Sequence, residues 1–375
     1  MKRILILLVY AASILNLITG CRTLVPTPDV SQPSAPPAAA ATTSAHANEL
    51  EPGPAENESF NDRIPLIFSH DGAPDDITAM AYIAKHPRID LLGVVNSYGE
   101  QHPSRSADEW ARFMYEIIDM DEVPLAIGSE TSLDPAQNEF PASWRDGADD
   151  FWGINLPAGS GDYTFADGAD LIINLVHGST QPVTILITGA HTDMALALRK
   201  DPGIAKNINR IVIMGGAFNG GGNLNGAVGT TNNNVAEWNI YVDALAAKEV
   251  FNSGIPLSVI SLDGSDNFVI TQADINRIQG SSDSIVGLVN EMWEWSFMVW
   301  GGDFKIWDIV AAVALTNPEL ITWSNYYMDV IAEPGNTHGQ TITRDENPNP
   351  SGFSVSTDFD GVKNQVFEVL LGQNE

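Results

Sequence analysis

The chain has 375 residues, of which 44% are hydrophobic and 18% charged, so it can bury a large apolar core. It carries 18 Lys and Arg against 48 Asp and Glu, a formal charge of −30. A surface of that sign repels phosphate backbones and anionic lipid headgroups, which argues against binding of a nucleic-acid polymer or electrostatic membrane binding. The one cysteine, Cys21, excludes a disulfide scaffold and a cysteine zinc site in the folded part.

The first twenty residues have the pattern of a signal peptide. Two basic residues precede a nearly apolar run over 4–18, which is too short for a stable membrane span. The run ends in the letters LITGC at 17–21, which resemble a bacterial lipobox and predict cleavage before Cys21 and acylation of its thiol. The alternative is an ordinary secretory signal with a chance cysteine.

Residues 21–61 contain the cysteine and a stretch rich in Pro, Ala, Ser and Thr without apolar periodicity, which is typical of a disordered tether. We therefore expect a lipid-anchored protein of the bacterial cell envelope that faces the periplasm or the exterior. Arg22 stands where an Asp would suggest inner-membrane retention, so the outer membrane is preferred. Residues 62–375 are expected to form a single domain.

From Arg63 onward, short apolar strands alternate with amphipathic helices. Strands are expected at 64–68, 89–95, 123–127, 183–188, 208–214 and 255–260. Helices are expected at 74–85, 107–118, 166–178, 192–199, 244–251 and 284–300. Strands at 327–332, 341–343 and 353–357 and a helix at 361–371 close the chain. Strands that are apolar throughout are buried on both faces, and intervening helices act as crossovers, so the pattern predicts an α/β fold with an open, mostly parallel central sheet flanked by helices.

An acidic segment directly follows the first predicted strand, where ligands of such sheets bind. Asp71, Asp75 and Asp76 place three carboxylates within six residues, which repel one another unless a cation or protons intervene. Asp75 and Asp76 follow Pro74 in a helical first turn and can instead be explained as capping, but Asp71 ahead of Gly72 cannot. From the spacing alone, a hard-cation site and helix capping both stay open.

Seven segments, in order along residues 63–372, resemble the inosine/uridine-preferring nucleoside hydrolases. The segment SHDGAPDD at 69–76 is similar to the signature DxDPGxDD of that family. The others are LLGVV followed by Gly99, VPLAIG, ITGAHTDMA, VIMGG, AEWN with Asp243, and WD with Ala311 and Ala312. Each segment alone is weak, whereas seven in the right order and spacing form a strong combined signal.

The resemblance implies an enzyme that holds one Ca²⁺ and hydrolyses the N-glycosidic bond of ribonucleosides to free base and ribose. By similarity, the metal ligands would be Asp71, Asp76, the backbone carbonyl of Thr188, and Asp308, and Asp71 would also take the proton of the attacking water. The substrate-binding residues implied by the same match are Asp75, Glu100, Met214, Asn232 (or its neighbour Thr231), Glu237, Asn239 and Trp307.

The chain departs from the family pattern at Gly72-Ala73, where the signature has Pro-Gly, and at three further positions. Ser69 replaces the first signature acid, Glu100 stands where an Asn is usual, and Trp307 stands where some members have a His that protonates the leaving base. Help for the leaving group must then come from elsewhere or from stacking. The candidates for that site are Asp146, which could equally be a polar surface residue, and Trp238.

Several of these residues also have a structural explanation. Asp308 could be a helix N-cap, Met214 could be core, and Glu237 and Asn239 alternate in a strand-like run whose outer face would be solvated. The glycine- and asparagine-rich run 215–234 predicts a mobile lid and lacks the Lys-Ser/Thr of a phosphate loop.

Two classes of function therefore remain. The favoured one is a nucleoside hydrolase, or a hydrolase of another ribosylated compound, because the acids at 71, 75, 76 and 308 are intact. The alternative is a non-catalytic nucleoside- or riboside-binding lipoprotein on the same fold, for which the departures at 69, 100 and 307 argue. Base preference and oligomeric state do not follow from the sequence, and a homo-oligomer stays open.

Overall fold

The computed structural model describes residues 63–159, 161–224, 232–344 and 351–372. The expected signal peptide, Cys21 and the tether lie outside the described residues, and so do positions 225–231 of the expected lid. Over the described ranges, none of the helices combines the length and the apolar character that a membrane span requires.

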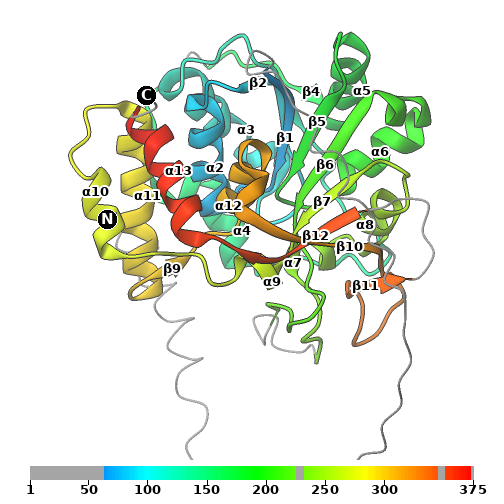
Figure 1. Ribbon diagram of the computed structural model, residues 1–375. Coiled ribbons are helices and arrows are strands. Elements are labelled where there is room, and N and C mark those ends of the chain that lie inside the picture. The colour runs from blue at the N-terminus through cyan, green and yellow to red at the C-terminus, as the bar shows by residue number, and fades with distance from the viewer. Residues whose placement is uncertain (1–62, 160, 225–231, 345–350, 373–375) are drawn as a thin grey trace, which may run out of the picture.

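Within these ranges, a ten-stranded sheet forms the centre of the molecule (Figure 1). Its strands are β1 (Ile64–His70), β2 (Ile89–Asn96), β3 (Leu125–Ile127), β4 (Ala166–Asp167), β5 (Val183–Ile187), β6 (Ile208–Met214), β7 (Leu257–Ile260), β10 (Ile321–Val330), β11 (Thr341–Arg344) and β12 (Ser351–Thr357). Their spatial order is β11-β10-β12-β7-β6-β5-β1-β2-β3-β4, and β10 alone among them runs antiparallel to its neighbours. A separate ribbon pairs β8 (Val269–Ile270) with β9 (Phe304–Lys305).

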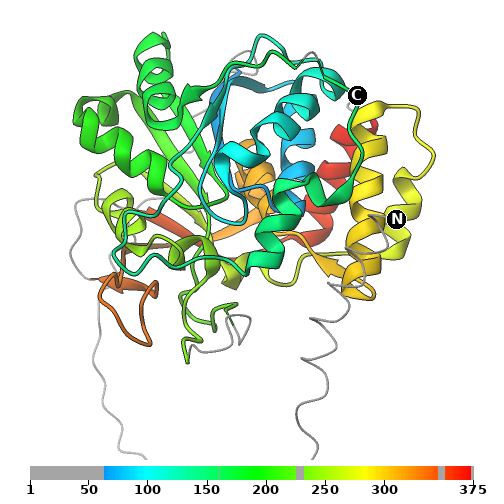
Figure 2. The ribbon, with the colours of Figure 1, turned by 180° about the vertical axis from the view of Figure 1, so that it is seen from behind.

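The longer helices form two layers, one on each face of the sheet (Figures 1 and 2). One layer consists of α2 (Pro74–Lys85), α3 (Pro103–Arg112), α11 (Ser284–Trp300), α12 (Asp308–Thr316) and α13 (Phe359–Leu371), and the other of α5 (Gly168–Gly178), α6 (Thr192–Lys200) and α8 (Ala244–Phe251). The remaining helical segments are α4 (Ala142–Asp149), α7 (Trp238–Tyr241), α9 (Leu262–Ser265), α10 (Gln272–Ile278) and the short turns η1 (Phe113–Ile117), η2 (Phe151–Gly153), η3 (Pro202–Asn207) and η4 (Pro318–Leu320).

Each central strand is buried on both faces, which is why it is apolar throughout. In β1, Leu66 and Phe68 pack into the core beneath α2, α11, α12 and α13, whereas Ile67 packs into the core beneath α5, α6 and α8. Successive side chains of a strand point to opposite faces, so a sheet covered twice needs apolar residues at every position. The predicted open, mostly parallel sheet flanked by helices is confirmed.

Several expected elements differ from the observed ones, and the largest differences are the following. The helix expected at 107–118 begins at Pro103 and widens into η1 over its last turn, and the helix expected from 166 begins at Gly168, because Asp167 caps it. The strand-like run around Glu237 is the start of α7, in which the Glu237 carboxylate accepts backbone N–H groups. Strand β10 begins at Ile321, ahead of the expected position 327. The sequence did not reveal its first half because the residues after Ile321 are exposed or half-buried and form no apolar run.

Candidate active site

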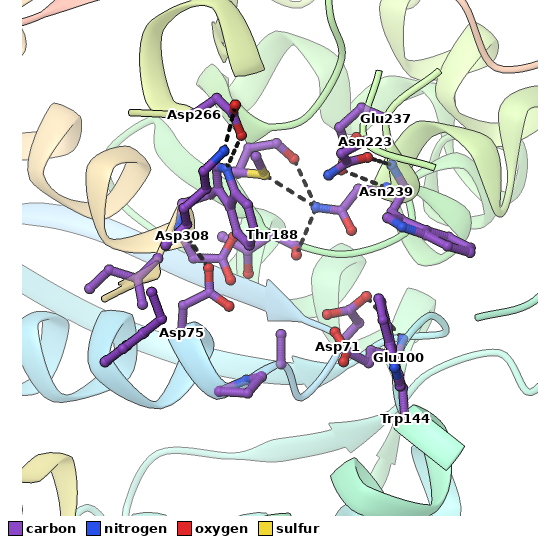
Figure 3. A pocket seen from close by; sticks show the side chains of 18 of the residues that line it. Asp71, Asp75, Glu100, Trp144, Thr188, Asn223, Glu237, Asn239, Asp266 and Asp308 are labelled. Carbon is purple, nitrogen blue, oxygen red and sulfur yellow. Dashed lines mark hydrogen bonds and ion pairs between the residues drawn. The ribbon is translucent and has the colours of Figure 1, made fainter. Parts of the chain in front are cut away.

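A cavity of about 500 Å³ lies beyond the carboxyl ends of β1, β5 and β6 (Figure 3). Its floor is built by residues that end or follow these strands, namely Asp71, Thr188 and Met214. Helix α7 adds Glu237 and Asn239, and the first residue of α12 adds Asp308. The topology places these side chains together because parallel strands end on the same edge of the sheet.

Asp71 is held between two glycines. Its Oδ2 accepts the backbone N–H of Glu100 at 3.0 Å. Gly99, at φ +151°, lies so close that a Cβ there would collide with the Asp71 carboxylate, and a Cβ at Gly189 would come within 2.6 Å of the Asp71 Cβ. Side chains at either position would displace this carboxylate, so the turn at Gly99 and the segment after β5 fix where Asp71 points.

Asp76 lies beneath the cavity and joins β1 to β5. Its Oδ2 accepts the backbone N–H groups of Ala73 at 3.0 Å and of Asp71 at 3.3 Å, and its Oδ1 accepts the hydroxyl of Thr188 at 2.6 Å. All of these groups are buried. The Asp76 carboxylate thus orders the turn that carries Asp71.

Asp75 joins the start of α2 to the start of α12. Its Oδ2 accepts the backbone N–H of Trp307 at 2.7 Å and of Asp308 at 3.1 Å. The indole N–H of Trp307 donates to Oδ1 of Asp266 at 3.2 Å. Trp307 is therefore fixed at both its backbone and its ring, with Asp308 directly beside it.

Glu237 and Asn239 fasten α7 to the strand ends. The two carboxylate oxygens of Glu237 accept the N–H groups of Asn239, Gly216 and Ile240 at 2.9, 3.0 and 3.2 Å. The side-chain amide of Asn239 donates to the carbonyls of Thr188 and Met214, each at 3.1 Å. Both side chains are buried, so the solvated strand face considered from the sequence is wrong.

Like charges crowd one end of this cavity. Burial raises the pKa values of Asp71, Asp75, Asp76, Glu100 and Asp308. Neighbouring charges raise the pKa values of Asp71, Asp76, Glu100 and Asp308 further, with Asp76 and Glu100 acting on Asp71, and Asp75 acting on Asp76, whose pKa reaches about 7. So many carboxylates cannot all ionise in one buried space, and the group needs protons or a cation for balance.

The oxygen atoms on the floor of the cavity have the chemistry that a hard divalent cation prefers. Carboxylates of Asp71, Asp76 and Asp308 and the carbonyl of Thr188 offer oxygen ligands only, in a region of excess negative charge. Among the described residues, however, no three His, Cys, Asp or Glu side chains are already arranged as a metal site. Asp76 Oδ1 accepts the Thr188 hydroxyl and the Thr188 carbonyl accepts the Asn239 amide, and each of these oxygens keeps a second lone pair for a cation.

Aromatic side chains form the walls. Six of the nine tryptophans line the cavity: Trp144, Trp152, Trp238, Trp295, Trp300 and Trp307. Phe140 stacks on Trp238 with 4.5 Å between ring centroids, Trp144 meets Trp300 edge-on at 6.3 Å, and Trp152 lies 5.1 Å from Trp295. An acidic floor beneath aromatic walls suits a ligand with one hydroxyl-rich part and one flat aromatic part.

The structure brings together most of the residues singled out from the sequence. Those that line the cavity are Asp71, Asp75, Glu100, Thr188, Met214, Glu237, Trp238, Asn239, Trp307 and Asp308. Asp146 and Asn232 are exposed and line no part of it. Asn223, from the same glycine-rich run as Asn232, does line it, and its Oδ1 accepts the backbone N–H of Trp238 at 3.1 Å.

No histidine occurs among the described residues that line the cavity. His70 and His191 are fully buried beside it, and burial lowers the pKa of each to about 3, so both are neutral near pH 7. The sequence reading missed Trp295, Trp300, Lys305 and Asp266, which reach the cavity from α11, from β9 and from the turn after α9. The one available signal was the density of tryptophan near the end of the helix expected at 284–300.

Comparison with known proteins supports the same interpretation. Residues 66–367 match the family model described as inosine-uridine preferring nucleoside hydrolase. The chain is 32% identical over 288 residues to the pyrimidine-specific ribonucleoside hydrolase RihA of Salmonella schwarzengrund, a match that covers 74% of this chain and 88% of that protein. A protein of the same description from Shewanella sp. (strain ANA-3) is 32% identical over 259 residues, covering 69% and 77%.

Solved structures share the fold. The purine-preferring ribonucleoside hydrolase from Gardnerella vaginalis superposes with a TM-score of 0.71 at 24% identity, covering 82% of this chain and 98% of that one. The inosine-uridine preferring nucleoside hydrolase from Bacillus anthracis gives 0.70 at 20% identity, covering 82% and 99%. With the family model spanning nearly the whole described domain, the chain belongs to the inosine-uridine preferring nucleoside hydrolase family, and it is an N-glycosyl hydrolase.

Proposed function

We propose that this enzyme hydrolyses the N-glycosidic bond of ribonucleosides to free base and ribose, with Asp71 as the residue that accepts the proton of the attacking water. The observation that carries the proposal is the placement of Asp71. It is a buried carboxylate with a raised pKa, fixed by Gly99 and Gly189 on the floor of a cavity whose walls are aromatic. A general base must lie within reach of the proton that it takes, and this carboxylate lines the cavity from a fixed position.

The other floor residues would bind and orient the ribose. Asp75, Glu237 and Asn239 offer polar atoms on rigid elements, each held by hydrogen bonds to backbone groups. Contacts to ribose hydroxyls can strengthen as the ring flattens toward an oxocarbenium-like transition state. The tryptophan walls would hold the base and exclude water from the rest of the cavity.

Asp71, Asp76, the Thr188 carbonyl and Asp308 would hold a Ca²⁺ ion. Bound there, such an ion would lower the pKa of a water molecule and neutralise part of the crowded negative charge. Support for this assignment comes from the all-oxygen donor set and from the mutual repulsion that raises the pKa of Asp71 and Asp308.

We also propose that Cys21 is acylated after cleavage of the signal peptide and anchors the enzyme in the bacterial cell envelope, facing the periplasm or the exterior. The support is the LITGC segment with the only cysteine of the chain, followed by a tether-like composition. A Cys21→Ser variant should move from the membrane fraction to the soluble fraction, and retention in the membrane fraction would contradict the anchor.

The proposed activity is tested with the purified full chain and Ca²⁺ on inosine, uridine, adenosine, guanosine and cytidine, with released ribose as the readout. Asp71→Asn should lower kcat by about 10²–10⁴-fold, and chelation should abolish ribose release. Asp146→Asn, on the exposed face of α4, is the matched control and should retain activity. If no nucleoside releases ribose while ligands still raise the Tm, the protein is a binding protein instead.

A further inference from the structure

The turn that carries Trp152 has an unusual backbone. Phe151, Trp152 and Gly153 follow one another in the left-handed region, at φ +47°, +57° and +74°. Bulky side chains rarely adopt this conformation, so two of them in succession need a surrounding structure that holds them there. Phe151 supplies part of that support, because its buried ring packs edge-on against Trp110 at 5.6 Å between centroids and lies 5.5 Å from Phe113. Backbone strain is thus maintained at the residue that carries the Trp152 side chain into the cavity.

This strained turn directs the Trp152 indole at the loop between β1 and α2. The indole N–H donates to the Gly72 carbonyl at 2.9 Å, and the Trp152 side chain is buried. Gly72 itself has φ +82°, and a Cβ there would come within 2.5 Å of Gln101 Oε1. Gln101 is fully buried, so Gly72 has little room on that side. The loop after β1 is therefore confined between Trp152 and Gln101.

One peptide unit transmits this contact to the floor of the cavity. The Gly72 carbonyl and the Ala73 N–H belong to the same planar peptide and point in opposite directions. The Ala73 N–H donates to Asp76 Oδ2 at 3.0 Å, and the same oxygen accepts the Asp71 N–H at 3.3 Å. A hydrogen bond to a carbonyl also polarises its amide, which strengthens the donor on the other side. The Trp152 indole and the Asp76 carboxylate therefore hold one peptide from its two ends.

We propose that Trp152 is a positioning residue, which acts through the peptide between Gly72 and Ala73 to fix Asp76 and Asp71 for the reaction. The inference rests on the proposed function, because it assumes the roles given there to both carboxylates. It assigns to Trp152 a role other than contact with the base, although its ring lines the cavity. The strain of the turn follows from this role, because a right-handed backbone would change the direction of the indole.

Three variants separate the hydrogen bond from the packing of the ring. Trp152→Phe removes the indole N–H and keeps an aromatic ring on the cavity wall. Benzothienylalanine at position 152 has sulfur in place of that N–H and nearly the same shape, so it removes the hydrogen bond even if phenylalanine disturbs the packing. Trp293→Phe is the matched control, because its buried indole donates to Thr78 Oγ1 at 3.0 Å and neither residue lines the cavity.

The first two measurements do not depend on activity. Hydrogen exchange of residues 69–76, followed by mass spectrometry on the full chain, should be about 3–10-fold faster in both position-152 variants, as expected for the loss of one hydrogen bond. Titration calorimetry should show about 10–100-fold weaker Ca²⁺ binding, since Trp152 orients two of the proposed ligands. Trp293→Phe should match the parent in both measurements.

The third measurement compares kcat with KM for uridine and inosine at saturating Ca²⁺. Misplacement of a reacting group by about 1 Å can cost about 10²-fold in rate, so both position-152 variants should lower kcat about 10–100-fold. KM should change by less than about 3-fold, because an aromatic ring still lines the wall. A residue that acted only by contact with the base would raise KM at an unchanged kcat.

The outcomes separate the inference from the proposed function. Unchanged hydrogen exchange at 69–76, or a raised KM at an unchanged kcat, would overturn the positioning role and leave the hydrolase activity in place. An equal fall of kcat in Trp293→Phe would also overturn it, because the loss of any buried indole bond would then suffice. If the parent releases no ribose from any nucleoside, the proposed function fails, and hydrogen exchange and Ca²⁺ titration still decide whether Trp152 holds the turn.

Discussion

Replacing Thr188 by Val tests whether the bond from its hydroxyl to Asp76 serves the site or only the fold. Valine has nearly the same shape and keeps the backbone carbonyl proposed as a cation ligand, so the change removes little more than a hydroxyl. That hydroxyl donates to Asp76 Oδ1 at 2.6 Å between two buried side chains. Without it, no side-chain hydroxyl among the described residues donates to the Asp76 carboxylate.

The cost in stability can be estimated from the structure. A hydrogen bond to a charged group contributes about 1.5–3 kcal/mol. For a domain of about 300 residues the unfolding entropy at Tm is about 0.6 kcal/mol/K, so Thr188→Val should lower Tm by about 2–5 °C. Since the Thr188 hydrogen bond lowers the pKa of Asp76, the variant should also raise that pKa further above about 7.

Thr192→Val is the matched control. The hydroxyl of Thr192 donates to Asp243 Oδ2 at 2.7 Å, again between buried side chains, but neither residue lines the cavity. Both variants should lose similar stability in calorimetry with chelator present. Groups that orient metal ligands typically change affinity about 10–100-fold, so only Thr188→Val should weaken Ca²⁺ binding in titration calorimetry. Equal Ca²⁺ affinity in the two variants, or an unchanged Tm for Thr188→Val, would refute the reasoning.

Three further changes probe the rest of the fold. Asp193 accepts the Ser129 N–H at 3.0 Å, its Oδ2 has no hydrogen-bond partner among the described residues, and burial raises its pKa to about 7. Because this pKa lies above the unfolded value, the protein should lose stability as pH rises from about 4 to about 7, by up to about 1.4 kcal/mol per pH unit, and urea titrations of Asp193→Asn should lack that component. Asp243→Ala orphans the Leu133 and Ala246 N–H groups and the Thr192 hydroxyl, so it should cost about 3–5 kcal/mol by urea unfolding, and a loss below 1 kcal/mol would contradict the assigned bonds. Trp293→Phe removes the indole bond to Thr78 Oγ1 at 3.0 Å and should lower the free energy of unfolding by about 1–3 kcal/mol while kcat/KM is unchanged, and reduced turnover would show that α11 positions the cavity wall through this contact.

The positions of the central strands along the chain and the residues at their ends could be predicted from the sequence. Strands buried on both faces read as continuous apolar runs, and β6 and the helices α2, α8 and α11 have the bounds expected from their pattern. Parallel strands all end on one edge of the sheet, so residues such as Asp71, Thr188 and Met214 had to meet there. The local sequence pattern was sufficient to predict these floor residues, because a parallel sheet brings the ends of its strands together at one edge.

Two details show where the local pattern is insufficient. Glu237 and Asn239 alternate with apolar neighbours like a strand, yet the Glu237 carboxylate caps α7 and Asn239 bridges β5 and β6. Asp146 was a reasonable acid by its neighbours but lies on the exposed face of α4. For Asn239 the partners that decide its position, the carbonyls of Thr188 and Met214, are far away in the chain.

The sequence by itself determined the fold class and the acidic floor of the cavity, because both depend on apolar periodicity and on chain order along parallel strands. Which residues form the walls of the cavity was decided only by the tertiary structure. Trp300 and Trp295 lie on a helix whose position follows from packing against α2 and α10, and Asp266 and Lys305 come from segments joined by the β8–β9 ribbon. Helix packing and long-range hydrogen bonds leave no pattern in the local sequence. The aromatic and acidic residues of the cavity walls were therefore found only in the tertiary structure.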